Sequence, residues 1–211
     1  MSWSEWIRTV EIEPTLEACD PLRVGPQVEA LLRTGCRLFG LALDGELAGL
    51  PLVSQLAPPV HRYGGALDVY LTGAAAPSAC AAVAQAGGDS VTFQLEHVTD
   101  LDGLVRAAHA ESLQAGVAFS ASSAPEEVAA RAGAANLVRC PGGELDEQLR
   151  CVRRLARALG PGVVIQAGGG IDYANVREYY DAGARVLLVG TAIFEREDLP
   201  RAYRRLVQAL A

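Results

Sequence analysis

Two glycine turns carry the clearest chemistry in this chain. Gly168-Gly169-Gly170 and Gly190-Thr191 each close a short apolar run and precede a helical pattern. A glycine turn between a strand and the start of a helix leaves backbone N–H groups unpaired at the positive end of the helix dipole. These N–H groups can bind phosphate without a metal. We therefore predict one shared anion site that uses Gly169, Gly170, Gly190 and Thr191. The alternative is that these glycines only permit tight turns.

The basic residues exclude two kinds of catalysis. All 18 are arginine, and lysine is absent from the chain. Schiff-base aldolase chemistry and decarboxylation assisted by a buried ammonium both need a lysine amine. Neither mechanism is open to this chain.

Composition also limits the partners. A net charge of −7 with dispersed arginines argues against nucleic acid, which needs a concentrated basic face, although a local nest of amides can still bind a small anion. No apolar run has the length of a signal peptide or a membrane span. We expect a cytoplasmic protein with no membrane partner. Its five cysteines show no CxxC spacing, which favours free thiols and no disulfide.

The elements that must position these residues follow from alternating patterns. Expected strands are 10–12, 38–43, 67–71, 90–95, 117–119, 136–138, 163–167 and 186–189. Expected helices are 24–34, 76–86, 102–115, 125–132, 145–159, 175–182 and 199–210. Eight such units close a (β/α)8 barrel, so the fold class is α/β and we predict a single TIM-barrel domain over residues 1–211. Region 46–63, which holds three prolines, is predicted to be a long loop at the active-site end.

Polar side chains mark two neighbouring strands of this predicted barrel. Residues two apart in a strand point the same way. The two polar faces consist of Asp68, Tyr70 and Thr72 on one strand, and of Thr92, Gln94 and Glu96 on the next. Tyr70 is a candidate general acid or a donor to a carbonyl, with simple filling of space as the alternative. Glu96 and Asp68 are candidate acid or base groups, and Gln94 is a candidate substrate contact.

Later strands add further candidates. Ser120, on the fifth strand, could donate to a substrate, and Arg139 ends the sixth strand. Arg139 near an anion site would bind phosphate, or it would form a salt bridge to an acid of the barrel. Cys140 is a weaker candidate, as a nucleophile, because no histidine lies close to it in sequence.

The chain also resembles the ribulose-phosphate 3-epimerase family. The segments that carry this resemblance are LDVYLTG, GGDSVTFQLEH, AGGGIDYANV and VGTAIF, and the spacing matches from about Glu11 onward. The resemblance implies a (β/α)8 barrel, a phosphorylated small-molecule substrate, a homo-oligomer and a divalent metal held by two histidines and two aspartates. By position, Thr15 matches a family serine that contacts substrate, and Asp44 matches a family aspartate.

Departures from the family pattern fall on the metal ligands. Phe39 and Leu41 stand where the family has a His-x-Asp pair, Tyr70 replaces a histidine, and Gly168 replaces the last aspartate. Leucine and glycine cannot accept a proton, and a phenol is a poor ligand for a divalent metal at neutral pH. We therefore expect no metal, no cofactor and no pentulose-phosphate epimerisation.

Two functions remain open. The first is a metal-independent isomerase, epimerase or lyase acting on a phosphorylated or carbonyl-bearing small molecule, with Tyr70, Glu96, Asp44 and Asp68 as candidate catalytic groups. The second is a catalytically inactive barrel that serves as a ligand-binding or regulatory protein.

Overall fold

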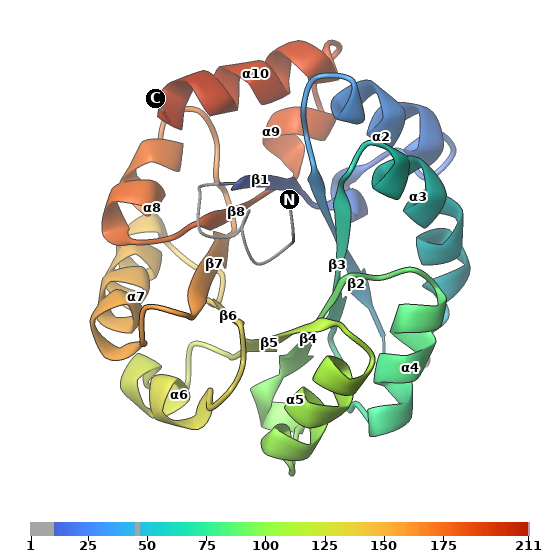
Figure 1. The fold of residues 1–211 in the computed structure, drawn as a ribbon. Helices are drawn as coiled ribbons and strands as arrows, with labels where there is room; N and C mark the ends of the chain where they lie inside the picture. Colours follow the sequence, from blue (N-terminus) through green and yellow to red (C-terminus); the bar gives the residue numbers. More distant parts are fainter. Residues whose placement is uncertain (1–10, 45–46, 211) are drawn as a thin grey trace.

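The computed structural model describes residues 11–44 and 47–210. Eight parallel strands form a ring with helices around its outside (Figure 1). The strands are β1 (Glu11–Pro14), β2 (Leu38–Leu43), β3 (Ala66–Leu71), β4 (Ser90–Gln94), β5 (Gln114–Ala118), β6 (Leu137–Arg139), β7 (Val164–Gly168) and β8 (Val186–Val189). The predicted (β/α)8 barrel is confirmed.

The strand order around the ring is β1-β8-β7-β6-β5-β4-β3-β2. Between β1 and β2, the described part of the chain shows a single bridge, from Thr15 to Gly40. Because helices cover one face of every strand and barrel side chains fill the other, the strands are buried on both sides. This explains the uninterrupted apolar runs, such as the fully buried Val186–Val189.

The outer layer begins with α2 (Val24–Leu32), which packs against α3 and α10. The helices that follow are α3 (Leu50–Arg62), α4 (Pro77–Gln85), α5 (Leu101–Ala110), α6 (Pro125–Arg131), α7 (Leu145–Ala158), α8 (Val176–Ala182), α9 (Thr191–Phe194) and α10 (Leu199–Leu210). Two short 3-10 helices, η1 (Leu16–Ala18) and η2 (Leu95–His97), follow β1 and β4. Both therefore lie at the carboxyl ends of strands, where barrel enzymes place their sites.

The prediction of a long loop over 46–63 is wrong, because most of this region is α3. Pro51 lies in the first turn, where a helix needs no N–H donor. Pro58 and Pro59 lie inside the helix, which costs hydrogen bonds. Burial of an apolar face made by Val53, Leu56, Ala57 and Val60 offsets that cost.

The boundary between α5 and β5 was also misplaced. The helix predicted over 102–115 ends at Ala110, and the strand already begins at Gln114. Ser112 has a φ of 64°, a left-handed conformation that stops the helix, and Leu113 N–H bonds back to the Ala108 carbonyl. A serine is a weak sequence signal for such a stop, because glycine is the usual residue there.

Candidate functional site

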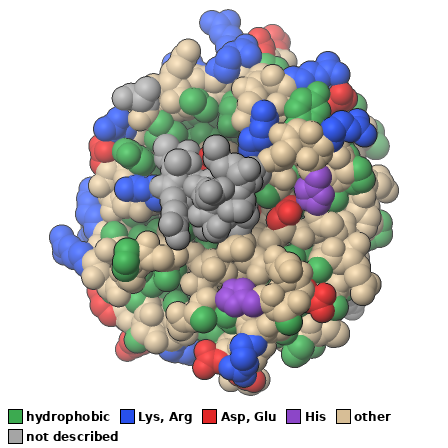
Figure 2. Space-filling view, in the orientation of Figure 1, with side chains coloured by type: hydrophobic (Ala, Val, Ile, Leu, Met, Phe, Trp, Pro, Cys, Tyr) green, Lys and Arg blue, Asp and Glu red, His purple; other side chains and the backbone are tan. Residues whose placement is uncertain are grey.

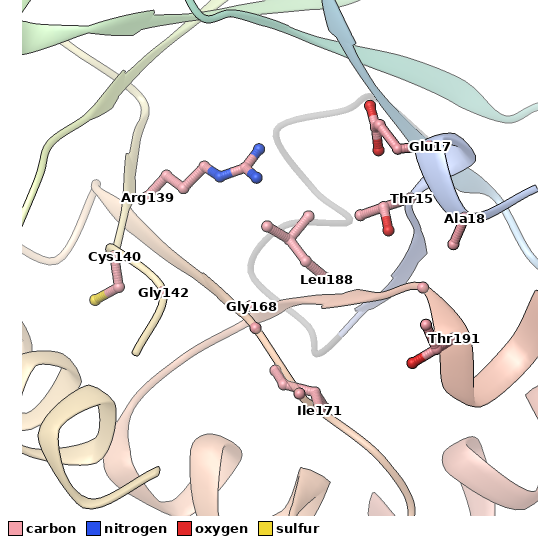
Figure 3. Close-up of a pocket in the computed structure, with 13 residues that line it drawn as sticks. Thr15, Glu17, Ala18, Arg139, Cys140, Gly142, Gly168, Ile171, Leu188 and Thr191 are labelled. Atoms are coloured by element: carbon pink, nitrogen blue, oxygen red, sulfur yellow. The ribbon is translucent and has the colours of Figure 1, made fainter. Parts of the chain in front are cut away.

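A cavity of about 540 Å³ opens at the carboxyl ends of four strands. Its walls come from Thr15 after β1, Arg139 at the end of β6, Gly168 to Gly170 after β7, and Gly190 and Thr191 after β8. Figure 3 shows these residues around one space. We call it the anion cavity. Six residues predicted from the sequence as ligand contacts therefore lie together here: Thr15, Arg139, Gly169, Gly170, Gly190 and Thr191.

The two glycine turns present unused backbone donors to this cavity. The N–H groups of Gly169, Gly170 and Thr191 donate no hydrogen bond to any described residue. Gly169 and Gly170 have φ of 102° and 80°, a left-handed backbone that glycine adopts without strain. Neither glycine carries a Cβ, so an anion in the cavity can approach these backbone N–H groups closely.

The first glycine turn does not lead directly into a helix, although the helix predicted over 175–182 is present as α8. α8 starts at Val176, and α9, which does start at Thr191, has only four residues. A helix dipole acts within its first turn and needs a helix of some length. The donors at this site are therefore individual N–H groups, because a helix follows directly only at the second turn and that helix is a single turn long.

Arg139 supplies the positive charge of the anion cavity. Its side chain reaches into the cavity from β6 (Figure 3). The guanidinium carbon lies 4.3 Å from the centre of the Tyr70 ring, a cation–π contact that holds the side chain in place. No ion pair joins Arg139 to any acid in the described part of the chain. The alternative that Arg139 forms a salt bridge is thus not what the structure shows.

Glu17 is a site residue that the sequence did not single out. It lies in η1, two residues after Thr15, and lines the anion cavity on the side opposite Arg139 (Figure 3). Its side chain is exposed, and one carboxylate oxygen accepts the N–H of Ala42 on β2. The sequence signal was a group of three glutamates near the first strand, Glu11, Glu13 and Glu17, of which one could point inward.

Tyr70, Gln94, Glu96 and Ser120 form a hydrogen-bonded chain beside the anion cavity. The Tyr70 hydroxyl donates to Gln94 Oε1, and Gln94 Nε2 donates to Glu96. Ser120 N–H then donates to Glu96 Oε1 at 2.7 Å. None of the four residues lines the anion cavity, but the chain reaches it through the contact between Tyr70 and Arg139.

In this hydrogen-bonded chain, the surroundings fix the protonation states of the Glu96 carboxylate and the Tyr70 phenol. Burial alone would raise the pKa of Glu96, but hydrogen bonds from Ser120 outweigh it and lower this pKa to about 2. Burial raises the pKa of Tyr70, and the nearby Arg139 only partly opposes this. At neutral pH the Glu96 carboxylate is therefore ionised and the Tyr70 phenol is protonated. Glu96 lies in η2 rather than on β4, so strand alternation could not place it.

Asp68 lies below the anion cavity, in the closed interior of the barrel. Gln166 Nε2 donates to Asp68 Oδ2 at 2.8 Å and to Glu13 Oε2 at 2.7 Å, which joins three fully buried side chains. Burial, and then the Asp68 carboxylate, raise the pKa of Glu13 well above its usual value. A Cβ on Gly40 would overlap Glu13 Oε1. The glycine on β2 therefore makes room for this carboxyl group.

Asp44, the fourth predicted catalytic residue, follows β2 and is exposed. It does not line the anion cavity, and neither do Asp68 and Glu96.

Within residues 11–44 and 47–210, no three His, Cys, Asp or Glu side chains cluster in a way that could hold a metal ion. In the same residues, no helix is both long and apolar enough to cross a membrane. On the face seen in Figure 2, arginine side chains are spread around the edge rather than gathered in one patch.

We predict that Arg139→Gln weakens phosphate binding by about 10- to 100-fold, because a charge-assisted hydrogen bond contributes about 1.5–3 kcal/mol. Arg150→Gln, outside the anion cavity, changes the net charge equally and is the matched control. Titration of both variants with inorganic phosphate, followed by calorimetry, gives the two affinities. Equal affinities would contradict the assignment.

Valine variants of the glycines are less informative than the comparison of Arg139→Gln with Arg150→Gln. A Cβ on Gly190 would lie 2.9 Å from Thr15 Oγ1, and a Cβ on Gly169 would lie 3.2 Å from Gln148 Nε2. Both variants would therefore disturb the protein itself before they met a bound anion, and loss of binding in them would not isolate the anion contact.

The fold and site define the class of protein as a TIM barrel with a candidate anion cavity at the strand ends. Solved structures of the same fold include orotidine 5'-phosphate decarboxylase from Pyrococcus horikoshii, with a TM-score of 0.73 and 17% identity over 94% of this chain and 98% of that one. Thiamine phosphate pyrophosphorylase from Pyrococcus furiosus has a TM-score of 0.72 and 16% identity over 98% and 97% of the two chains. A 3-hexulose-6-phosphate synthase has a TM-score of 0.71 and 19% identity over 96% and 100%.

Sequence comparison gives one narrower likeness. Ribulose-phosphate 3-epimerase of Aquifex aeolicus is 35% identical over 60 residues, which are 28% of this chain and 27% of that protein. No protein-family model matches the chain. The resemblance drawn from the sequence is therefore supported over a short segment, and membership of the epimerase family remains a prediction.

Proposed function

We propose that this chain is a metal-independent enzyme, an isomerase, epimerase or lyase, that acts on a small phosphorylated carbonyl compound held in the anion cavity. One observation carries the proposal: Gly169, Gly170 and Thr191, whose N–H groups donate to no other described residue, line the same cavity as Arg139. The proteins compared above support the ligand class, because all four are named for phosphate-bearing compounds.

Glu17 is the group that we assign to proton transfer. It is the carboxylate among the described residues that line the anion cavity, and it faces Arg139 across it. With the phosphate group on the glycine turns, the carbon skeleton of a short ligand would extend toward Glu17. A carboxylate within reach of a carbon next to a carbonyl can remove its proton. The guanidinium of Arg139 would stabilise the negative charge that develops.

Tyr70, Gln94 and Glu96 then act on the ligand through Arg139. Glu96 already accepts hydrogen bonds from Ser120, Ser123 and Gln94, so it is poorly suited to remove a proton. Instead it orients Gln94, which in turn fixes the Tyr70 hydroxyl under the guanidinium. The three residues are therefore assigned a positioning role, which replaces the catalytic role predicted for Tyr70 and Glu96 from the sequence.

The test is a proton-exchange assay that needs no knowledge of the product. Phosphorylated aldehydes and ketones of three to six carbons are first ranked by the thermal shift that they cause. Those that stabilise the protein are incubated with it in deuterated water, and magnetic resonance follows the entry of deuterium next to the carbonyl. Exchange or a new product supports an enzyme. Stabilisation by a ligand with neither change would overturn the proposed catalysis and support the alternative of a binding barrel.

We predict that this activity survives removal of divalent metals and that ribulose 5-phosphate is not epimerised. Phe39, Leu41, Tyr70 and Gly168 cannot replace the metal ligands of the epimerase family. Loss of each acid or base group costs about 10²–10⁴-fold in rate. The measurements are deuterium exchange with and without a chelator, and a coupled assay for xylulose 5-phosphate. Activity that vanishes with the chelator and returns with added metal would contradict this prediction.

A further inference from the structure

A pair of thiols lies on the outer side of the sixth strand. The sulfur atoms of Cys140 and Cys151 are 3.4 Å apart. Cys140 directly follows Arg139 and is itself one of the residues that line the anion cavity, but its sulfur points away from the cavity, whereas the Arg139 guanidinium points into it (Figure 3). Cys151 projects from α7 toward Cys140. Residues 141–144 and the first two turns of α7 connect Cys140 to Cys151.

Cys151 is accessible, whereas Cys140 is buried. Cys151 lines a second cavity of about 510 Å³, together with Ser122, Gly142, Arg150 and Arg154. This volume far exceeds the roughly 30 Å³ that a water molecule occupies in the liquid, so a small reagent can reach the sulfur. The Cys140 thiol lies behind it.

The other cysteines lack this arrangement. Cys19, Cys36 and Cys80 are buried, and within the described residues none of them lies within hydrogen-bonding distance of a second sulfur. Burial raises the pKa of each of these three thiols. Such thiols are protonated at neutral pH and therefore react slowly.

The charges around the pair favour a thiolate on the accessible sulfur. Hydrogen bonding to Cys151, followed by burial, raises the pKa of Cys140. The hydrogen bond from Cys140 lowers the pKa of Cys151 and the positive charge of Arg154 adds to this, while burial and the Glu126 carboxylate oppose it only in part. The proton therefore stays on the inner sulfur, and the outer sulfur is the nucleophile.

We propose that Cys140 and Cys151 form a peroxide-reactive dithiol, in which Cys151 is oxidised first and Cys140 then closes an intramolecular disulfide. The inference stands on the sulfur–sulfur distance and on the second cavity, and it is independent of the proposed function of the anion cavity. Its reagent is a small hydroperoxide, such as hydrogen peroxide.

The two steps balance as follows. The Cys151 thiolate attacks one peroxide oxygen, the O–O bond breaks, and the leaving hydroxide or alkoxide takes a proton from solvent; sulfur is oxidised to a sulfenic acid. The Cys140 sulfur then loses its proton and attacks the Cys151 sulfur, the S–O bond breaks, and water leaves. One peroxide is reduced for each disulfide formed. Closing the bond requires the sulfur atoms to approach from 3.4 Å to about 2.05 Å.

The experiment counts and maps thiols in the reduced wild-type protein. Before oxidation, an aromatic disulfide reagent in denaturant titrates all five cysteines. After one equivalent of hydrogen peroxide we expect a loss of two thiols, a cross-linked peptide that contains Cys140 and Cys151, and full recovery with dithiothreitol. Retention of every thiol, or a disulfide that maps to another pair, overturns the proposal without any variant.

Variants separate the two roles. In Cys140→Ala the sulfenic acid of Cys151 cannot be resolved, so dimedone labels Cys151. In Cys151→Ala, peroxide leaves the remaining thiols intact and dimedone does not label Cys140. Cys80→Ala, which removes a cysteine outside the pair, is the matched control and should still lose two thiols. Equal oxidation of Cys151→Ala and wild type would show that Cys151 is not the peroxide-reactive thiol and would refute the order of steps.

Discussion

Glu17→Gln is expected to slow deuterium exchange into a bound phosphorylated carbonyl compound by about 10²–10⁴-fold, the usual contribution of a positioned general base. Glutamine keeps an oxygen that can still accept the Ala42 N–H, so the cavity wall is preserved. An amide cannot take up the proton. Because the phosphate contacts lie on the opposite turns, the ligand affinity should change little.

A lower exchange rate with unchanged ligand affinity would show that Glu17→Gln impairs catalysis, because a misfolded variant would lose affinity as well. Glu111→Gln, which alters an exposed glutamate at the end of α5, is the matched control and should exchange deuterium like wild type. Calorimetry with the same ligand gives the affinity of each variant. If Glu17→Gln retains the wild-type exchange rate with unchanged affinity, the base lies elsewhere, and Asp44 becomes the next candidate.

The second large effect concerns stability and pH. The pKa of Glu13 is raised in the folded state by burial and by Asp68, whereas in the unfolded chain it is about 4.3. Below that pH, both the folded and the unfolded state hold the proton, and the full contribution of Glu13 to the free energy of unfolding is present. As the pH rises further, the unfolded chain releases a proton that the folded protein keeps. The contribution of Glu13 to the free energy of unfolding therefore falls by about 1.4 kcal/mol per pH unit until the folded pKa is reached.

We predict that Glu13→Gln removes this slope. A glutamine mimics the protonated acid and can still accept from Gln166, so the variant gains stability over wild type as the pH rises from 5 to 8. Urea unfolding at several pH values measures both free energies. Glu195→Gln, at an exposed position, should follow wild type at every pH. Parallel curves for Glu13→Gln and wild type would mean that Glu13 is ionised in the folded protein.

Sequence patterns were sufficient for the barrel because each strand is buried on both faces and separated from the next by a helix. The glycine turns could be predicted for a similar reason. A left-handed backbone at Gly169 and Gly170 requires glycine, so the residue type itself reports the conformation. Arg139 lines the same cavity as the glycine turns, because it ends a strand beside them.

Other features depend on tertiary structure that short patterns do not encode. Glu17 faces the cavity only because η1 turns the chain after β1. Gln166 bonds to Glu13, 153 residues away in sequence, and no local signal joins two such distant residues. The prolines of α3 favoured a loop by propensity, but burial of its apolar face overrides propensity. Glu96 was misplaced because β4 ends two residues earlier.

The single bridge between β1 and β2 has a dynamic consequence. Amide hydrogens exchange with solvent through local opening, which takes place where the fewest interactions must break. In the described part of the ring, β1 and β2 are joined by the bridge from Thr15 to Gly40 and by the bond from Ala42 to Glu17, while other neighbours share a ladder. We therefore expect local opening of the barrel to cost the least free energy beside Thr15 and Glu17. Both residues line the anion cavity, so amide hydrogens in this wall of the cavity should exchange early.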